Sequence, residues 1–168
     1  VTVNIKAASD AMLQAVKEGG TRFRDAPHED FVLGNIKARQ RMIAQYAVAG
    51  AYGSVVVGTD HAAEALMGFF TKFGDGAADL TPLAGLSKRR VRALAQALGA
   101  PDALTYKVPT ADLESLTPQK PDEHAFGLTY DQLDDFLEGK IVSPDVFERI
   151  VDIFRRTAHK RALPYAPE

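Results

Sequence analysis

The chain has 168 residues, of which 46% are hydrophobic and 25% are charged, and it contains no cysteine. These proportions are those of a globular protein, and the net charge of −2 argues against a nucleic-acid-binding protein. No apolar run approaches the roughly 20 residues of a membrane span, and disulfides and thiolate metal sites are excluded within these residues. We therefore expect no membrane contact and a cytoplasmic location.

The first third of the chain predicts two helices between two short strands. Asp10 can cap a helix that Gly19 and Gly20 end, and a longer helix carries Met42 and Tyr46 at helical spacing. A charged, proline-containing loop is expected between the helices. The predicted elements are a strand over residues 1–6, a helix over 10–17, a loop over 21–31, a helix from about residue 35 to 50, and a strand over 54–57.

The second strand leads directly into polar residues that can form a ligand site. Thr59 and Asp60 can cap a helix that begins near His61, and helix N-termini at the ends of strands offer N–H groups to phosphate. Glu64 lies one turn into this helix, where a carboxylate beside phosphates can hold Mg²⁺. The alternative is that Asp60 is only a cap and Glu64 a solvated side chain. His61 has no partner spacing typical of zinc and is interpreted as structural.

The remainder of the chain continues the alternation of helix and strand. Ser87 predicts a helix start, Thr129 opens a capping box, and Ser143 with Pro144 begins the last helix. Residues 104–108 are predicted as a strand. The three prolines of residues 107–127 indicate an irregular segment, either a mobile lid over an active site or an ordinary surface loop. The alternation predicts an α/β fold with a parallel sheet and helices on both faces.

Several separated segments together resemble one protein family. The longest is residues 58–76, and the others are residues 34–42, 86–89, 109–113 and 159–161. Their residues and order are similar to those of ammonia-dependent NAD synthetases, which belong to the ATP pyrophosphatase group. The resemblance implies an adenine nucleotide α-hydrolase-like (Rossmann-like) fold, with residues 1–168 forming the C-terminal portion of a single synthetase domain. The N-terminal part of that domain, including the family's phosphate loop, is missing from this sequence.

The resemblance also implies a reaction and a set of residues. ATP would activate the carboxylate of deamido-NAD as an acyl-adenylate with release of pyrophosphate, and ammonia from solution would displace AMP to give NAD, with Mg²⁺ required. Asp75 and Lys88 fall on catalytic positions, Asp75 as the acceptor of a proton from ammonium, and Glu64 falls on a Mg²⁺ ligand. The ATP-binding positions are Thr59, Lys88 and Thr110. The deamido-NAD-binding positions are Arg39, Lys72, Asp79, His159 and Lys160.

The residue types suit this chemistry independently of the family. Charge that builds on phosphorus needs fixed cations, which Lys72 and Lys88 could supply, and the planar guanidinium of Arg39 suits a phosphate or a carboxylate. There are alternatives for these cations. Arg39 could be a solvated helix residue, and the cations at 159–161 could be partners of a helix dipole. A homodimer is implied by the family. Another ATP pyrophosphatase ligase, guanylate-forming or tRNA-thiolating, and a non-catalytic nucleotide-binding module remain alternative functions.

Overall fold

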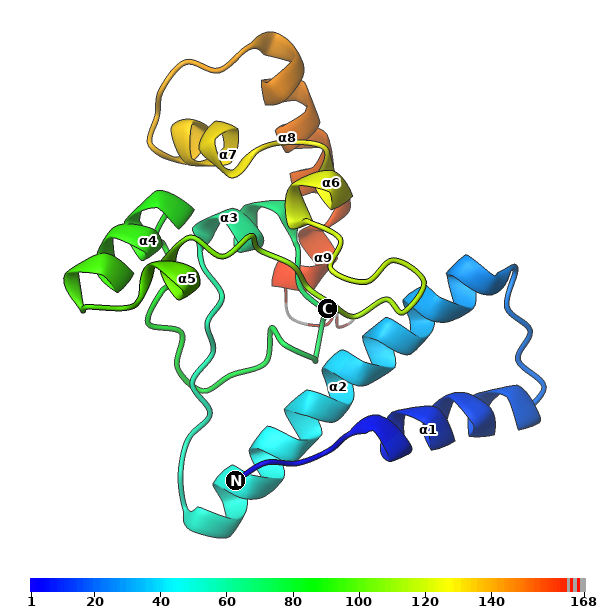
Figure 1. The fold of residues 1–168 in the computed structure, drawn as a ribbon. Coiled ribbons are helices and arrows are strands. Elements are labelled where there is room, and N and C mark those ends of the chain that lie inside the picture. Colours follow the sequence, from blue (N-terminus) through cyan, green and yellow to red (C-terminus); the bar gives the residue numbers. More distant parts are fainter. Residues whose placement is uncertain (163, 165, 167–168) are drawn as a thin grey trace. The chain divides into compact units, whose positions relative to one another are not determined.

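The computed structural model describes residues 1–162, 164 and 166, and its ribbon is shown in Figure 1. The chain divides into two compact units. The first unit comprises Val1–Gly58, Thr71–Leu80 and Thr110–Lys120, and the second comprises Thr59–Phe70, Thr81–Pro109 and Pro121–Glu168. Each unit is built from segments that are far apart in the sequence, so each is described separately.

The first unit is organised around helix α2, Ala26–Tyr52, against which α1, Lys6–Glu18, packs (Figure 1). Asp25 caps α2 by accepting a hydrogen bond of 2.7 Å from the His28 amide, and Gly53 ends it in the left-handed conformation with φ 60°. The buried positions of α2 are mostly small, and they include Gly34, Ala38 and Ala49. Small side chains let neighbouring backbone approach the helix closely.

Three sequence-based predictions for this unit were wrong. Residues 1–5 form no strand, and Asp10 lies inside α1 instead of capping it. The predicted loop over residues 21–31 is shorter, because α2 begins at Ala26 and not near residue 35. The reason is local: Asp25 supplies a capping carboxylate, and Pro27 occupies the first turn, where proline fits a helix.

The second unit is a group of helices around one hydrophobic core. The core joins α3 to α6, α7 and α8 and consists of Ala63, Met67, Phe126, Leu128, Tyr130, Leu133, Val146 and Ile150. The helices of this unit are α3 Ala62–Met67, α4 Lys88–Ala97, α5 Asp102–Thr105, α6 Asp122–Phe126, α7 Tyr130–Leu137, α8 Pro144–Arg156 and α9 Ala158–Arg161. None of the helices among the described residues is both long and apolar enough to cross a membrane.

The predicted helix starts of the second unit are confirmed. Ser87 caps α4 by accepting from the Arg90 amide, Thr129 and Gln132 form the capping box of α7, and Ser143 precedes α8. The helix predicted from His61 to about residue 73 ends already at Met67, because Gly68 is left-handed with φ 60°. The basic residues His159, Lys160 and Arg161, which were expected to end the last helix, lie in a separate short helix, α9, that follows α8.

The described residues contain no extended strand. Residues 54–57 contribute one isolated parallel bridge, between Val57 and Leu80, and residues 104–108 begin inside α5 instead of forming a strand. The predicted irregular segment 107–127 is also interrupted by α6. A strand needs the backbone of a neighbouring strand for its hydrogen bonds, and here only residues 79–80 meet residues 56–58.

Candidate functional site

The second unit brings two predicted site residues, Glu64 and Lys88, to the same imidazole. His61 is buried, with 3% of its surface exposed, and its Nε2 atom lies 3.3 Å from Lys88 Nζ and 3.4 Å from Glu64 Oε1. The second carboxylate oxygen of Glu64 accepts a hydrogen bond of 3.1 Å from the His61 amide. A cation and a carboxylate thus share one neutral neighbour.

The starts of two helices create this cluster. His61 is the N-cap of α3, and Lys88 is the first residue of α4. The Ala62 amide donates to the Leu86 carbonyl at 2.9 Å, which ties the two starts together. The Lys88 and Arg89 amides donate to the two carboxylate oxygens of Asp134, at 2.9 and 2.7 Å. Asp134 is 1% exposed, so the position of Lys88 depends on a buried carboxylate of α7.

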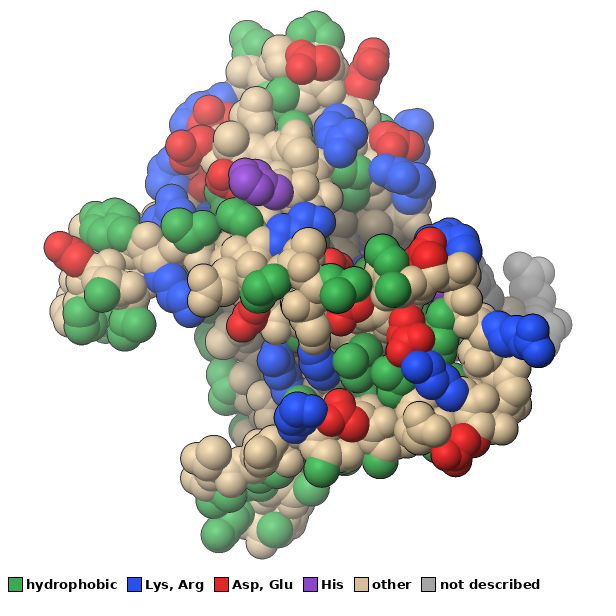
Figure 2. Space-filling view, turned by 45° about the vertical axis from the view of Figure 1, so that its right-hand side comes forward, with side chains coloured by type: hydrophobic (Ala, Val, Ile, Leu, Met, Phe, Trp, Pro, Cys, Tyr) green, Lys and Arg blue, Asp and Glu red, His purple; other side chains and the backbone are tan. Residues whose placement is uncertain are grey.

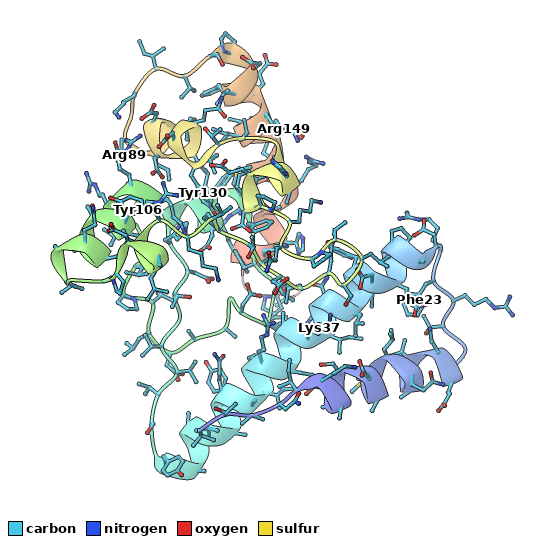
Figure 3. The ribbon with its side chains drawn as sticks, in the orientation of Figure 1. Phe23, Lys37, Arg89, Tyr106, Tyr130 and Arg149 are labelled. Atoms are coloured by element: carbon cyan, nitrogen blue, oxygen red, sulfur yellow. The ribbon has the colours of Figure 1, made fainter. Side chains whose placement is uncertain are left out.

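Side chains on the surface of α4 reinforce the same connection. Ser87 donates to Glu138 at 3.0 Å, and the Arg89 guanidinium forms ion pairs with Asp135 at 3.0 Å and with Glu138 at 2.8 Å. Arg89 is labelled beside α7 in Figure 3. These exposed pairs contribute little individually, but together they hold α4 against α7.

Burial controls the protonation of the cluster. Burial, assisted by the charge of Lys88, lowers the pKa of His61 to about 4, so the imidazole is neutral at pH 7. Burial raises the pKa of Glu64 to about 7, although the His61 amide and Lys88 act in the opposite direction. Since Lys88 Nζ can only donate, Nε2 of the neutral imidazole must accept from it, and the proton resides on Nδ1.

An aromatic side chain completes the surroundings of Lys88. The Tyr130 ring centroid lies 5.1 Å from Lys88 Nζ and 5.9 Å from the His61 ring (Figure 3). Tyr130 is 2% exposed, and its hydroxyl donates to Asp122 at 2.9 Å, while its amide donates to Glu123 at 2.7 Å. Both carboxylates belong to α6, so α6 fixes the aromatic ring that faces the lysine.

The first unit brings together three other predicted residues, Arg39, Lys72 and Asp75. Arg39 Nη2 donates to the Lys72 carbonyl at 3.2 Å, and Asp75 accepts from the Thr71 amide at 2.8 Å, which closes the turn between them. Gly74 in this turn lies against α2, because a Cβ atom there would be 3.2 Å from the Ala38 Cβ. Arg39 follows Ala38, so the close approach at Gly74 places the turn beside Arg39.

Asp79 has a structural partner in the same unit. Its Oδ2 atom accepts from the Val56 amide at 2.7 Å, and its Oδ1 atom lies 3.5 Å from the Tyr46 hydroxyl. These bonds connect α2 with the bridge between Val57 and Leu80. These contacts give Asp79 a structural role, and its role in binding deamido-NAD stays a prediction.

Thr110 lies in a segment that α2 holds. Asp30, 8% exposed, accepts from the Ser115 and Leu116 amides at 2.9 and 2.8 Å. Lys37 donates to the Leu113 carbonyl at 2.9 Å (Figure 3), and Gly34 leaves room for Leu113. Three positions on one face of α2 therefore hold residues 113–116. Because Thr110 belongs to the first unit, its predicted association with Thr59 and Lys88 of the second unit remains a prediction.

The predicted C-terminal residues contact α3 within the second unit. Lys160 Nζ donates to the carbonyls of Gly68 and Phe70, each at 2.8 Å, and its ammonium lies 5.6 Å from the Phe70 ring centroid. Lys160 therefore stabilises the end of α3, while the side chain of His159 is exposed. The roles of His159 and Lys160 toward a ligand are untested by these contacts.

Glu64 suits a magnesium ion as a single protein ligand. Its carboxylate is largely buried, and burial raises its pKa to about 7 despite the nearby charge of Lys88, a shift that a bound divalent ion would reverse. Among the described residues, no three His, Cys, Asp or Glu side chains gather to form a complete metal site. Mg²⁺ commonly binds through one or two carboxylates, phosphates and waters, so this arrangement fits an ion that arrives with a nucleotide. Thr59, three residues before α3, is exposed at the same edge.

Sequence reasoning did not identify His61, Tyr130 or Asp134 as parts of the cluster. His61 was interpreted as structural because it has no metal-ligand spacing, and its contact with Lys88 spans 27 positions. Tyr130 and Asp134 occupy buried positions on α7. An acidic residue on the buried face of an amphipathic helix was the available signal for Asp134, because a buried carboxylate requires hydrogen-bond donors.

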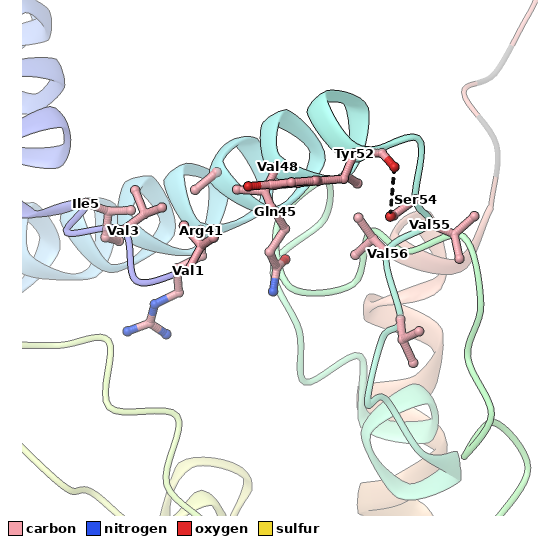
Figure 4. Close-up of a pocket in the computed structure, with 13 residues that line it drawn as sticks. Val1, Val3, Ile5, Arg41, Gln45, Val48, Tyr52, Ser54, Val55 and Val56 are labelled. Carbon is pink, nitrogen blue, oxygen red and sulfur yellow. Dashed lines mark hydrogen bonds between the residues drawn. The ribbon is translucent and has the colours of Figure 1, made fainter.

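The first unit also has an apolar hollow of about 670 Å³, shown in Figure 4. It lies between the N-terminal segment, α2 and residues 54–57, and it is lined by Val3, Val48, Tyr52 and Val55 among others. None of the predicted site residues lines it. Figure 2 shows hydrophobic side chains at the surface between charged ones, in keeping with the exposure of Tyr52, Val55 and Leu80.

Comparisons with known proteins agree on one family. The family model described as NAD synthase matches residues 1–164. The NH(3)-dependent NAD(+) synthetase of Streptomyces coelicolor is 68% identical over 99% of this chain and 60% of its own length. The NH(3)-dependent NAD(+) synthetase of Burkholderia pseudomallei is 65% identical over 98% of this chain and 58% of its own length. Two solved structures are similar. NMN synthetase from Francisella tularensis has TM-score 0.87 and 41% identity over 99% of this chain and 66% of its own. The structure of NAD+ synthetase from Burkholderia pseudomallei has a TM-score of 0.78 and 64% identity, over 97% of this chain and 60% of its own. The chain thus spans about 60% of the length of the curated relatives.

Proposed function

This chain belongs to the NAD synthase family, and from that premise we propose that the complete protein is an ammonia-dependent NAD synthetase. The reaction would convert deamido-NAD, ATP and ammonia into NAD, AMP and pyrophosphate. The observation that best supports this proposal is the cluster around His61, in which a buried carboxylate and an ammonium contact one imidazole nitrogen and could together bind a magnesium-bound nucleotide. The identity of 68% with a synthetase of this name adds to it.

The first step would be adenylation. A carboxylate oxygen of the nicotinate group attacks the α-phosphorus of ATP, the bond to the β-phosphate oxygen breaks, and pyrophosphate leaves. Negative charge grows on the phosphate oxygens, and Lys88 is positioned to stabilise it. Thr59 and Thr110 would bind the nucleotide through their hydroxyl groups. Glu64 would hold Mg²⁺, whose contribution is to neutralise phosphate charge.

The second step would be amide formation. Ammonia attacks the acyl carbon of the adenylate, the acyl–oxygen bond breaks, and AMP leaves. Ammonium must first lose a proton, for which Asp75 is the proposed acceptor. Asp75 is exposed and accepts from the Thr71 amide, so proton transfer would require burial by bound substrate. Closure of residues 107–127 would supply that burial and exclude water from the adenylate.

The residues that would bind deamido-NAD are Arg39, Lys72, Asp79, His159 and Lys160. The contact between Arg39 and the Lys72 carbonyl supports a shared function of these two cations. Lys72 would present its charge to the ligand, and Arg39 would support the turn that carries it.

We further propose an α/β fold for the complete domain, with residues 54–57 joining a parallel sheet. The similarity to synthetase structures supports this assignment, as does the parallel bridge between Val57 and Leu80. Residues 1–168 would be the C-terminal portion of a single synthetase domain that functions as a cytoplasmic homodimer. Sedimentation of the complete protein tests the dimer.

The test is formation of product by the complete gene product. NAD and AMP are quantified by chromatography with deamido-NAD, MgATP and ammonium as substrates, and NMN formation is assayed in parallel because one structural relative is described as an NMN synthetase. Lys72→Ala and Arg39→Ala should weaken deamido-NAD binding more than ATP binding, and Lys88→Ala should do the reverse. Equal losses for both ligands by calorimetry would contradict the residue assignment. Ligand binding without turnover would indicate a non-catalytic module instead.

A further inference from the structure

The ammonium group of Lys88 is held without an ion pair in the described part of the chain. Its contacts are His61 Nε2 at 3.3 Å and the face of Tyr130 at 5.1 Å, and both partners are uncharged. Among the described residues of the second unit, the cations that form ion pairs are Arg89, Lys140 and Arg156, apart from the contact between the neutral His61 and Glu64. The positive charge of Lys88 therefore remains available for an anionic ligand.

A carboxylate nevertheless lies beside the same nitrogen of the imidazole. Glu64 Oε1 is 3.4 Å from His61 Nε2, so the imidazole nitrogen lies in contact with both charged groups. Without this nitrogen, Lys88 would lose the hydrogen-bond acceptor that holds it, and Glu64, which contacts the same nitrogen, would be available to pair with it. An ion pair between the two would neutralise the cation and occupy the carboxylate.

The position of His61 is fixed by burial and by contacts of its backbone and its ring. Its side chain is 3% exposed, its backbone amide donates to Glu64 at 3.1 Å, and its ring meets the edge of Tyr130 at 5.9 Å. Its Nδ1 atom is buried and has no hydrogen-bond partner in the described residues.

We propose that His61 is a positioning residue for ATP binding, which holds the Lys88 ammonium by a hydrogen bond to Nε2 and keeps it from pairing with Glu64. This inference rests on the proposed function, because it assigns Lys88 to the nucleotide and Glu64 to magnesium. Tyr130 completes the support as an uncharged face beneath the ammonium. The arrangement preserves both charges for one ligand, MgATP.

A matched pair of substitutions separates positioning from structure. His61→Gln carries an amide group that reaches about as far as Nε2, whereas His61→Asn is one methylene shorter and cannot reach Lys88. Because His61 is the N-cap of α3, and Asn is a far better N-cap residue than Gln, a structural role predicts that the Asn variant is the better of the two. The positioning role predicts the opposite order for the affinity for ATP, with the Gln variant binding more tightly than the Asn variant.

The experiment is calorimetric titration of the complete protein with MgATP, together with thermal unfolding of each variant. We expect His61→Asn to weaken MgATP binding about tenfold, as for loss of a hydrogen bond to a charged group, and His61→Gln to stay within about threefold of the original protein. Deamido-NAD binding should not change in either. If the Asn variant does not fold, His61→Leu replaces it, since leucine fills the volume without an acceptor. An ATP affinity that follows the order of thermal stability, or that changes in neither variant, would overturn the proposal.

A second titration tests the separation of the two charges. With EDTA present and ATP alone as the ligand, we compare His61→Asn in the original background and in Glu64→Gln. The loss of ATP affinity should shrink to less than about threefold when Glu64 cannot capture the lysine; an undiminished loss would contradict the mechanism. Absence of NAD formation by the unmodified protein would refute the proposed function alone, because both titrations measure binding and still decide the role of His61.

Discussion

Glu64 should make a contribution to the stability of this protein that falls with rising pH. Burial raises the pKa of the Glu64 carboxyl to about 7, compared with 4.5 for an unperturbed glutamate. Between these values the folded protein retains a proton that the unfolded chain has released. The stabilising contribution is therefore fully present below about pH 4.5 and is lost as the pH rises through 7.

The magnitude follows from the width of that window. A difference of about 2.5 pKa units corresponds to about 3 kcal/mol, which is an upper value because Glu64 retains 23% side-chain exposure. Glu64→Gln imitates the protonated acid, and its amide can still accept from the His61 amide through the carbonyl oxygen. The variant should be more stable than the original protein by less than about 1 kcal/mol at pH 5 and by up to about 3 kcal/mol at pH 8.

The assay is urea unfolding of both proteins at pH 5, 6, 7 and 8, with EDTA to remove divalent ions. His61 also titrates, since burial lowers its pKa to about 4 and makes stability rise with pH below about 6.5. That contribution occurs in both proteins and cancels to first order in the difference between them. A stability difference that does not vary between pH 5 and 8, or that favours the original protein at pH 8, would refute the reasoning.

Three further predictions concern the scaffold of the site. Asp134→Ala should cost about 3 kcal/mol or more in urea unfolding, because two buried amides at the start of α4 lose a charged acceptor, and Asp134→Asn should cost about half as much. Gly74→Ala would place a Cβ atom 3.0 Å from the Thr71 side chain, so it should lower the free energy of unfolding by about 1–3 kcal/mol and raise the KM for deamido-NAD. Gly50→Ala is the control: its Cβ atom would have no neighbour within 4 Å, and it should stabilise α2 by up to about 1 kcal/mol. Asp30→Asn should accelerate limited proteolysis within residues 110–120, as measured by mass spectrometry, because the Ser115 and Leu116 amides lose their carboxylate partner; an unchanged rate would contradict this.

Signals that act within a few residues were readable from the sequence. Ser87, Thr129 and Ser143 each mark a helix start, because a cap and the amides it serves lie within one turn. The same logic would have found Asp25, had its position before Pro27 been recognised as a helix start. These predictions needed no knowledge of the tertiary structure.

Strands and buried polar groups depend on partners that are distant in the sequence. The β-branched residues 54–57 resemble a strand, but their pairing depends on residues 79–80 and is limited to one bridge. Likewise, the assignment of Glu64 and Lys88 to one site followed from family resemblance, and the structure brings them together through His61. The sequence offered no means of seeing that His61 would be buried between them.

The chemistry expected at helix starts also changes once the hydrogen bonds are assigned. Sequence reasoning expected the amides at the helix start near His61 to bind phosphate. At the start of α4, the Lys88 and Arg89 amides donate to Asp134, and the Arg90 amide donates to Ser87. Because these amides already have acceptors, a phosphate at the start of α4 would have to be bound by side chains, of which Lys88 belongs to the cluster around His61. The Lys88 ammonium contacts His61 and Tyr130, which are both uncharged, so these contacts hold it in place without neutralising the charge that would act on a ligand.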